Sequence, residues 1–155
     1  MTSIHQLKPD NADFSVDDDG DPLIPDGNYS VMLDYFQTAM MFKAKQPKLI
    51  LTFTIVEFGE HHGKRIRCFF NVQRVIGKPQ KGGRFQVTRK QDFYREYQLL
   101  FNRTNNARLD RLPMSEFHGV TILAQVETVK RARGVELVGG AQYSVIRRLL
   151  KVVEK

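Results

Sequence analysis

The residues of this chain best suited to chemistry are the basic residues and phenylalanines between Lys64 and Lys90. This segment holds nine Lys and Arg residues and no Asp or Glu, and Phe69, Phe70 and Phe85 are interleaved with them. Like charges at this density repel one another unless an anion is bound nearby, and aromatic rings offer flat surfaces on which bases can stack. The segment therefore predicts binding of single-stranded nucleic acid.

Length and composition indicate one domain with a tail. The chain has 155 residues, of which 41% are hydrophobic and 10% aromatic, so it is long enough to bury a core. Its net charge of +7 is unevenly distributed: residues 1–26 hold seven Asp and one Lys, whereas residues 61–155 hold 20 Lys and Arg against seven acids, which leaves +13. We predict a flexible acidic arm over residues 1–26 and a basic domain over residues 27–155.

The cysteine content and the hydropathy pattern indicate where the protein acts. Cys68 is the only cysteine, so no disulfide can form within the chain. No apolar run approaches the roughly 18–20 residues that cross a bilayer, and the N-terminus lacks the pattern of a signal peptide. We expect a protein of the bacterial or host cytoplasm that does not bind membranes.

Alternating hydrophobicity predicts three strands in the first half of the domain. The first strand begins at residue 28 and places four residues on one face: Tyr29, Val31, Leu33 and Tyr35. The second strand covers Lys48–Phe58 and the third covers Lys64–Val72. Because successive side chains of a strand point to opposite faces, the third strand turns Arg65, Arg67 and Phe69 outward.

The second half of the domain predicts a helix followed by two strands. Residues 73–87 are rich in glycine and basic side chains, which is typical of a mobile loop or a loose hairpin. Thr88 and Gln91 have the spacing of a capping box and predict a helix over about Arg89–Asn102. Strands are expected over residues 120–126 and 142–146, while residues 147–155 fit either a strand or an apolar helix stripe. This order predicts a mainly β fold, a five-stranded OB-fold-like barrel with one helix between strands 3 and 4.

In such a barrel, strands 2 and 3 and the loops after strands 1 and 4 form the usual nucleic-acid surface. Four separate regions of the sequence supply basic or aromatic residues to these elements. The predicted site comprises Lys43, Lys45, Lys48, Arg65, Arg67, Phe69, Arg74, Lys78, Lys81, Arg84, Phe85, Arg131 and Arg133. We expect Phe69 to stack on bases, with Phe85 and Tyr35 as further candidates; the alternative is that these charges only make the surface soluble.

Other chemistry finds little support in the sequence. His61 and His62 lie near Glu57 and Glu60, but a zinc site needs three or four ligands in fixed geometry, so a solvated turn is the better interpretation. The glycines and lysines of residues 77–83 are not in the order of a phosphate-binding loop. We predict a protein that is not an enzyme and that binds no cofactor and no metal.

Several short segments carry a resemblance to a known family. They are Gly27–Tyr29 at the start of the first strand, the alternation of Leu49–Glu57, Gly63–Ile66 after a glycine turn, and Gln142–Ile146. Over about residues 25–150 the chain resembles phage and mobile-element proteins that bind single-stranded DNA through an OB fold. The resemblance implies a role in DNA replication or recombination, in which the protein coats exposed strands with little sequence preference, self-associates and contacts replication or recombination proteins.

The chain departs from this family at its two ends. Familiar bacterial single-strand binders carry an acidic C-terminal tail, whereas here Arg147–Lys155 is basic and the acids lie in residues 1–26. We hypothesise that the acidic arm folds over the empty groove and competes with DNA, or that it recruits a basic partner.

Three alternatives stay open at this point. The first is RNA in place of DNA, because stacking and phosphate contacts serve both. The second is a protein-interaction inhibitor or adaptor of a phage or mobile element, built on an OB-like barrel. The third is an endonuclease, which requires a cluster of carboxylates to bind magnesium. Oligomeric state and site size are also open.

Overall fold

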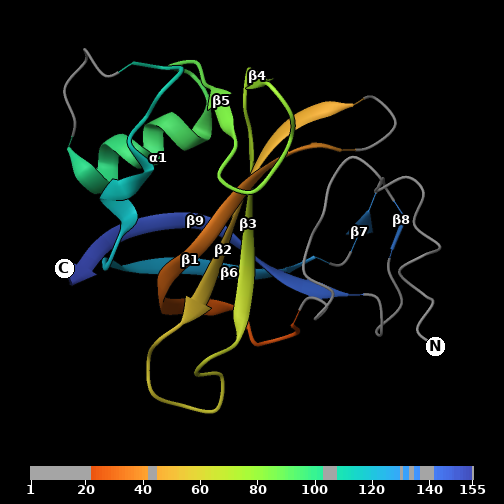
Figure 1. The fold of residues 1–155 in the computed structure, drawn as a ribbon. Helices are drawn as coiled ribbons and strands as arrows, with labels where there is room; N and C mark the ends of the chain where they lie inside the picture. The colour runs from red at the N-terminus through yellow and green to blue at the C-terminus, as the bar shows by residue number, and fades with distance from the viewer. Residues whose placement is uncertain are drawn as a thin grey trace.

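A computed structural model describes residues 22–41, 45–102, 108–129, 131–132, 135–136 and 142–154. Within these ranges the protein is mainly β, with one α-helix and one short 3-10 helix (Figure 1). The elements are β1 Gly27–Met41, β2 Gln46–Ile55, β3 Arg65–Asn71, β4 Arg74–Ile76, β5 Arg84–Gln86, α1 Asp92–Phe101, the 3-10 helix Met114–Phe117, β6 Thr121–Val129, β7 Arg131–Ala132, β8 Val135–Glu136 and β9 Tyr143–Glu154. Residues 1–21 of the predicted acidic arm lie outside the described residues. The described helix is too short and too polar to cross a membrane.

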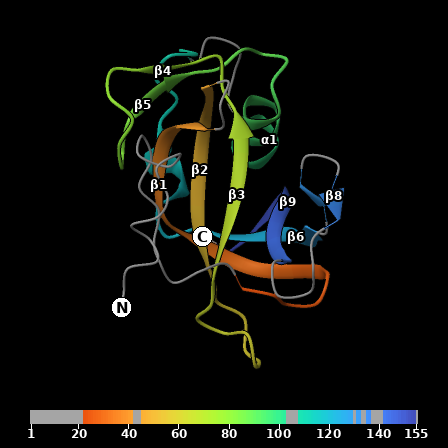
Figure 2. The same ribbon diagram turned by 90° about the vertical axis from the view of Figure 1, so that its right-hand side faces the viewer.

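Five strands close into a barrel in the order β1-β2-β3-β9-β6. All neighbours are antiparallel except β3 and β9, which run parallel and pair at Arg67 and Val145. Figure 2 shows β1, β2 and β3 side by side, with β9 and β6 to the right of the lower half of β3. The strands predicted at residues 28–35, 48–58, 64–72, 120–126 and 142–146 are thus all present, but β2 ends at Ile55 and not at Phe58, and β1 extends to Met41.

The barrel interior is filled by the side chains that strand alternation predicts. Leu49, Leu51 and Phe53 of β2 are fully buried, and the neighbouring strands add Ile66 and Ile122. Each such side chain contributes about 1.5–3 kcal/mol when it leaves water. The free thiol of Cys68 lies in the same core, where burial raises its pKa well above the ordinary value.

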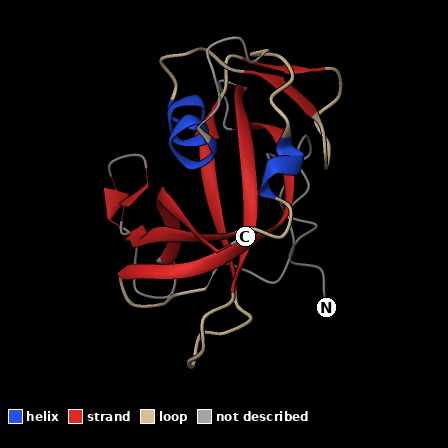
Figure 3. Cartoon of the chain, turned by 90° about the vertical axis from the view of Figure 1, so that its left-hand side faces the viewer, coloured by secondary structure: helices blue, strands red, loops and turns tan. Residues whose placement is uncertain are grey.

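Helix α1 starts later than predicted and does not follow β3 directly. Its first residue is Asp92, because Thr88 and Gln91 pair through the backbone N–H of Thr88 and Oε1 of Gln91 (3.0 Å) in the turn before it. The helix ends at Phe101, and the next residue, Asn102, caps it with a left-handed φ of 52°. Figure 3 shows α1 and the 3-10 helix beside the barrel strands. The helix precedes β6, which is the fourth barrel strand in chain order. The additional β4–β5 hairpin separates the helix from β3.

The β4–β5 hairpin is placed by hydrogen bonds to the free edge of β1. Pairing of β1 with β6 ends at Met32, and beyond this point the backbone of the hairpin turn takes the place of β6. Thr38 N donates to Gln80 O (3.0 Å), and Gly82 N donates to Phe36 O (2.9 Å). The prediction of a mobile loop or loose hairpin over residues 73–87 is therefore refined to a hairpin anchored on the barrel.

The C-terminal segment forms a strand and not a helix. β9 continues to Glu154 and pairs with β6 along its length, with register shifts that keep Leu149 and Val152 opposite Ala124 and Ile122. The apolar positions of residues 145–153 fit both a helix and a strand. The strand forms because it can pair with the backbone of β6.

Glu96 links α1 to β9 through a hydrogen bond. One carboxylate oxygen accepts a hydrogen bond from the backbone N–H of Leu149 (2.8 Å). The pKa of Glu96 is raised to about 7, chiefly by burial and in smaller part by Asp92, while the Leu149 hydrogen bond and Arg148 oppose the shift. The folded protein therefore holds this proton more strongly than the unfolded chain does.

This carboxyl should make stability depend on pH. The contribution of Glu96 is greatest below its ordinary pKa of 4.5 and is lost as the pH rises through about 7. Glu96→Gln keeps an acceptor for Leu149 but cannot ionise, so we expect it to be about 1 kcal/mol more stable than the parent at pH 8 and equally stable at pH 4. Urea unfolding at both pH values tests this, with the exposed Glu60→Gln as control. Parallel pH profiles for parent and Glu96→Gln would contradict it.

Candidate nucleic-acid interface

The outer surface of β1, β2 and β3 brings together basic and aromatic residues from distant parts of the chain. The register aligns Tyr35, Thr52 and Arg67 in one row across the three strands. The next row consists of Gln37, Ile50 and Phe69, and a bridge to Lys81 extends it by one residue beyond β1. We call this surface, with Lys48 and Arg65 at its ends, the outer face.

Tyr35 reaches the outer face because of a bulge in β1. Alternation predicts Tyr35 on the same side as Val31 and Leu33, which face the core. The register shifts between Leu33 and Tyr35, so the extra residue Asp34 rotates Tyr35 outward and leaves Phe36 packed against the core. The predicted side of Tyr35 is thus wrong, and the correction places its ring beside the predicted site.

Polar contacts position the cations of the outer face. Lys81 Nζ lies 4.2 Å from the centroid of the Tyr35 ring, a cation–π contact. Arg65 Nε forms an ion pair with Asp34 Oδ2 (3.1 Å). Burial lowers the pKa of Lys48, whose amine donates to Asn71 Oδ1 on the paired position of β3.

The centre of the outer face is shielded from water although it points away from the core. Ile50 and Ala39 are fully buried, yet neither belongs to the hydrophobic core cluster. Gln37 and Thr52 are only 2% exposed, and Gln37 Nε2 and Thr52 Oγ1 have no hydrogen-bond partner. An unsatisfied buried polar group costs about 1–3 kcal/mol. The centre of the outer face thus holds two polar atoms that are both shielded from water and unsatisfied.

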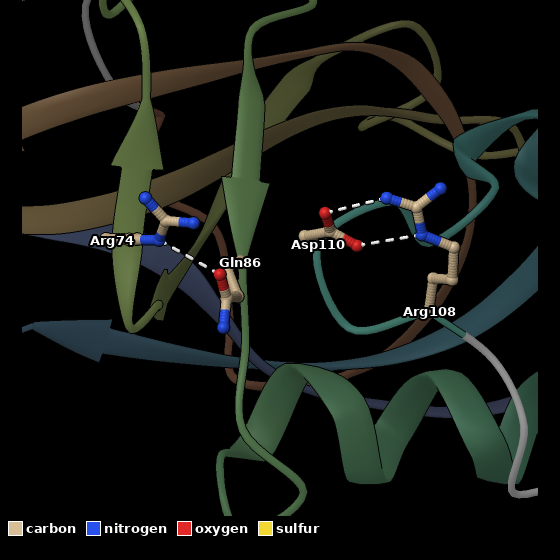
Figure 4. A network of polar contacts seen from close by, with 4 residues as sticks. All are labelled: Arg74, Gln86, Arg108 and Asp110. Carbon is tan, nitrogen blue, oxygen red and sulfur yellow. Dashed lines mark hydrogen bonds and ion pairs between the residues drawn. The ribbon is translucent and has the colours of Figure 1, made fainter.

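Besides Lys81, three predicted cations lie on the β4–β5 hairpin at the end of the barrel. Arg74 Nε donates to Gln86 Oε1 across the hairpin (2.9 Å; Figure 4), and Lys78 and Arg84 are exposed. Figure 4 also shows Asp110 of the loop before β6, which accepts two hydrogen bonds from Arg108 (3.1 and 2.9 Å).

Phe85 does not offer its ring to a ligand, which corrects the predicted stacking role. The side chain is 5% exposed and packs edge-on against Phe36 and Phe93, with centroid distances of 6.4 and 5.7 Å. The reason is the anchoring of the hairpin, which turns this side of β5 toward the core. Arg84 and Gln86, on either side of Phe85, face outward.

The remaining predicted residues belong to the loops after β1 and β6. Lys45 is exposed at the start of the second strand, with a left-handed φ of 54°. Arg131 lies in β7, of which only the backbone is described. Lys43 and Arg133 lie outside the described residues.

The turn between β2 and β3 holds an exposed aromatic residue that was not among the predicted site residues. Phe58 is 99% exposed, and its ring stacks on that of His62 with a centroid distance of 6.3 Å. The turn lies at the opposite end of the barrel from the β4–β5 hairpin (Figure 1). A phenylalanine directly before a glycine turn was the available signal. Within the described ranges, no group of His, Cys, Asp or Glu side chains is arranged to hold a metal ion.

The structure thus defines a mainly β protein whose five-stranded barrel carries a basic and aromatic outer face. Comparisons of the chain with protein-family models, curated proteins and solved structures find no match.

Proposed function

We propose that this protein is a non-enzymatic single-stranded DNA-binding protein whose barrel is an OB fold. The observation that carries the proposal is the alignment of Lys81, Tyr35, Arg67 and Phe69 on adjacent rows of the outer face. In OB folds the surface of the second and third strands binds oligonucleotides, and β2 and β3 occupy these places in the barrel.

The chemistry of the outer face suits a single strand better than a duplex. Cations neutralise phosphates, and aromatic rings such as the half-buried Tyr35 and Phe69 stack on unpaired bases at about 1–3 kcal/mol per base. Stacking needs no base-specific hydrogen bond, so sequence preference is weak. A role in replication or recombination, in which the protein coats exposed strands, is part of the proposal and comes from the family resemblance.

A test of this function is fluorescence anisotropy with a labelled DNA single strand, its duplex and the matching RNA. We expect the single strand to bind more tightly than the duplex. Four described cations on the outer face, Lys48, Arg65, Arg67 and Lys81, predict a logarithmic salt slope near −3, so affinity should fall about 50-fold between 50 and 200 mM salt. Equal binding of all three nucleic acids would contradict the proposal.

A second candidate function is recognition of a protein partner, and the β2–β3 turn favours it. Phe58 is fully exposed and is flanked by Glu57 and Glu60, whose charges repel phosphate. Absence of binding to any nucleic acid in the anisotropy experiment would favour this alternative.

A further inference from the structure

We propose that the acidic segment of residues 1–21 docks in cis on the outer face and competes there with single-stranded DNA. The competition rests on the proposed function; the docking itself does not. Four observations support the proposal: the place where the described chain begins, the reach of the segment, its chemistry, and the shielded state of the outer face.

The first described residues are fixed beside the outer face. Ser144 N donates to Pro22 O (2.8 Å), and Ser144 Oγ bonds both the N–H and the carbonyl of Ile24 (3.0 and 3.1 Å). Ile24 is 2% exposed and Ser144 is fully buried. The next residue of β9, Val145, pairs with Arg67 of β3. The acidic segment therefore joins the barrel one strand away from a cation of the outer face.

The reach of the segment matches the width of the outer face. Asp17, Asp18 and Asp19 precede Pro22 by only three to five residues, and an extended chain spans about 3.3–3.6 Å per residue. These carboxylates therefore lie within about 17 Å of Pro22. Adjacent strands are about 4.8 Å apart, so a span of this length extends from β9 across β3 and β2 to β1.

The chemistry of the segment complements that of the outer face. Residues 1–21 hold six Asp against one Lys, whereas the outer face holds Lys48, Arg65, Arg67 and Lys81. Carboxylates accept hydrogen bonds, and the amide of Gln37 and the hydroxyl of Thr52 are donors that have no partner.

The apolar residues of the segment also match apolar residues of the outer face. Phe14 and Val16 directly precede the three consecutive Asp residues. Ile50 and Ala39 on the outer face are buried outside the core, as expected for side chains covered by an apolar partner. A segment with one phenylalanine ring and several carboxylates offers the outer face the same two kinds of contact that bases and phosphates offer.

The docking is tested without DNA by paramagnetic relaxation. A nitroxide on Ser15→Cys of the full chain is expected to broaden the amide signals of Arg67 and Phe69, and the broadening should weaken at high salt. Cys68 is buried and stays unlabelled. A matched label on Arg95→Cys of α1 is the control and should leave Phe69 unaffected. Unbroadened Arg67 and Phe69 signals in the Ser15→Cys protein would overturn the docking.

A mixing experiment separates docking in cis from docking on a second copy. Isotope-labelled protein without nitroxide is mixed with unlabelled protein that carries the nitroxide at Ser15→Cys. Docking in cis predicts no broadening in this mixture. Broadening of Arg67 and Phe69 there would overturn the cis arrangement in favour of exchange between molecules.

The competition is tested by charge removal in the full chain. Asp17→Asn, Asp18→Asn and Asp19→Asn together should tighten single-stranded DNA binding about fivefold to tenfold at low salt. The matched control removes three acids elsewhere, with Glu60→Gln, Asp92→Asn and Glu154→Gln, and should change affinity less than threefold. Equal effects of the two triple variants would overturn the competition and leave DNA binding intact. If neither variant nor the parent binds DNA, the proposed function and the competition fail, while the relaxation experiment still decides the docking.

Discussion

Replacing Phe69 with alanine is expected to weaken single-stranded DNA binding by about 1–3 kcal/mol, which is roughly a 5-fold to 150-fold loss of affinity. Phe69 points away from the core, beside Ile50 in the second row of the outer face. Its removal therefore takes away a stacking surface without opening a cavity in the barrel. Anisotropy titrations at low salt measure the loss.

Two variants make this result specific. Phe69→Tyr keeps the ring and should bind within about twofold of the parent, because every base stacks on either ring. Arg67→Ala, on the adjacent row, should lower the magnitude of the salt slope by about 0.7, whereas Phe69→Ala should leave the slope unchanged. Unaltered affinity of Phe69→Ala would remove the outer face from the proposed binding site.

Replacing Phe93 with alanine is expected to lower the free energy of unfolding by about 3–5 kcal/mol. Phe93 of α1 is fully buried, and its ring lies 5.1 Å from Phe70, 5.7 Å from Phe85 and 6.4 Å from Phe117, centroid to centroid. One side chain thus joins the helix to β3, to the β4–β5 hairpin and to the 3-10 helix. Tyr97 and Phe101 of α1 also contact Phe117, so the loss falls mainly on the contacts with β3 and the β4–β5 hairpin.

Urea unfolding followed by circular dichroism measures this effect. Leu99→Ala on the same helix is the control, because Leu99 is 67% exposed and should cost less than about 0.5 kcal/mol. If Phe93→Ala does not fold, Phe93→Leu should still fold with a smaller loss of about 1–2 kcal/mol. A loss below 1 kcal/mol for Phe93→Ala would show that the aromatic cluster does not hold the helix on the barrel.

Part of the outer face follows from the sequence alone. The alternation of β3 places Ile66, Cys68 and Phe70 in the core, and this forces Arg65, Arg67 and Phe69 outward. Alternation is a local property of an extended chain, because each residue rotates the next side chain to the opposite face. The basic and aromatic character of the outer face was therefore predictable wherever a strand runs without interruption.

Other members of the outer face depend on contacts that no local pattern records. Tyr35 faces outward only because β1 bulges at Asp34, and Lys81 joins the row because its backbone pairs with Gln37, 44 positions earlier in the chain. Phe85 is lost from the predicted site for the same reason, since anchoring of the hairpin turns its ring toward Phe93.

Secondary structure, too, follows from the sequence in some segments and from tertiary contacts in others. The presence and chain order of the barrel strands follow from the amino-acid pattern, because apolar alternation can be recognised residue by residue. The pattern of residues 147–155 fits both a helix and a strand, since their apolar positions suit both periods. Packing settles this segment as part of β9, because the edge of β6 offers backbone hydrogen bonds to a strand and not to a helix.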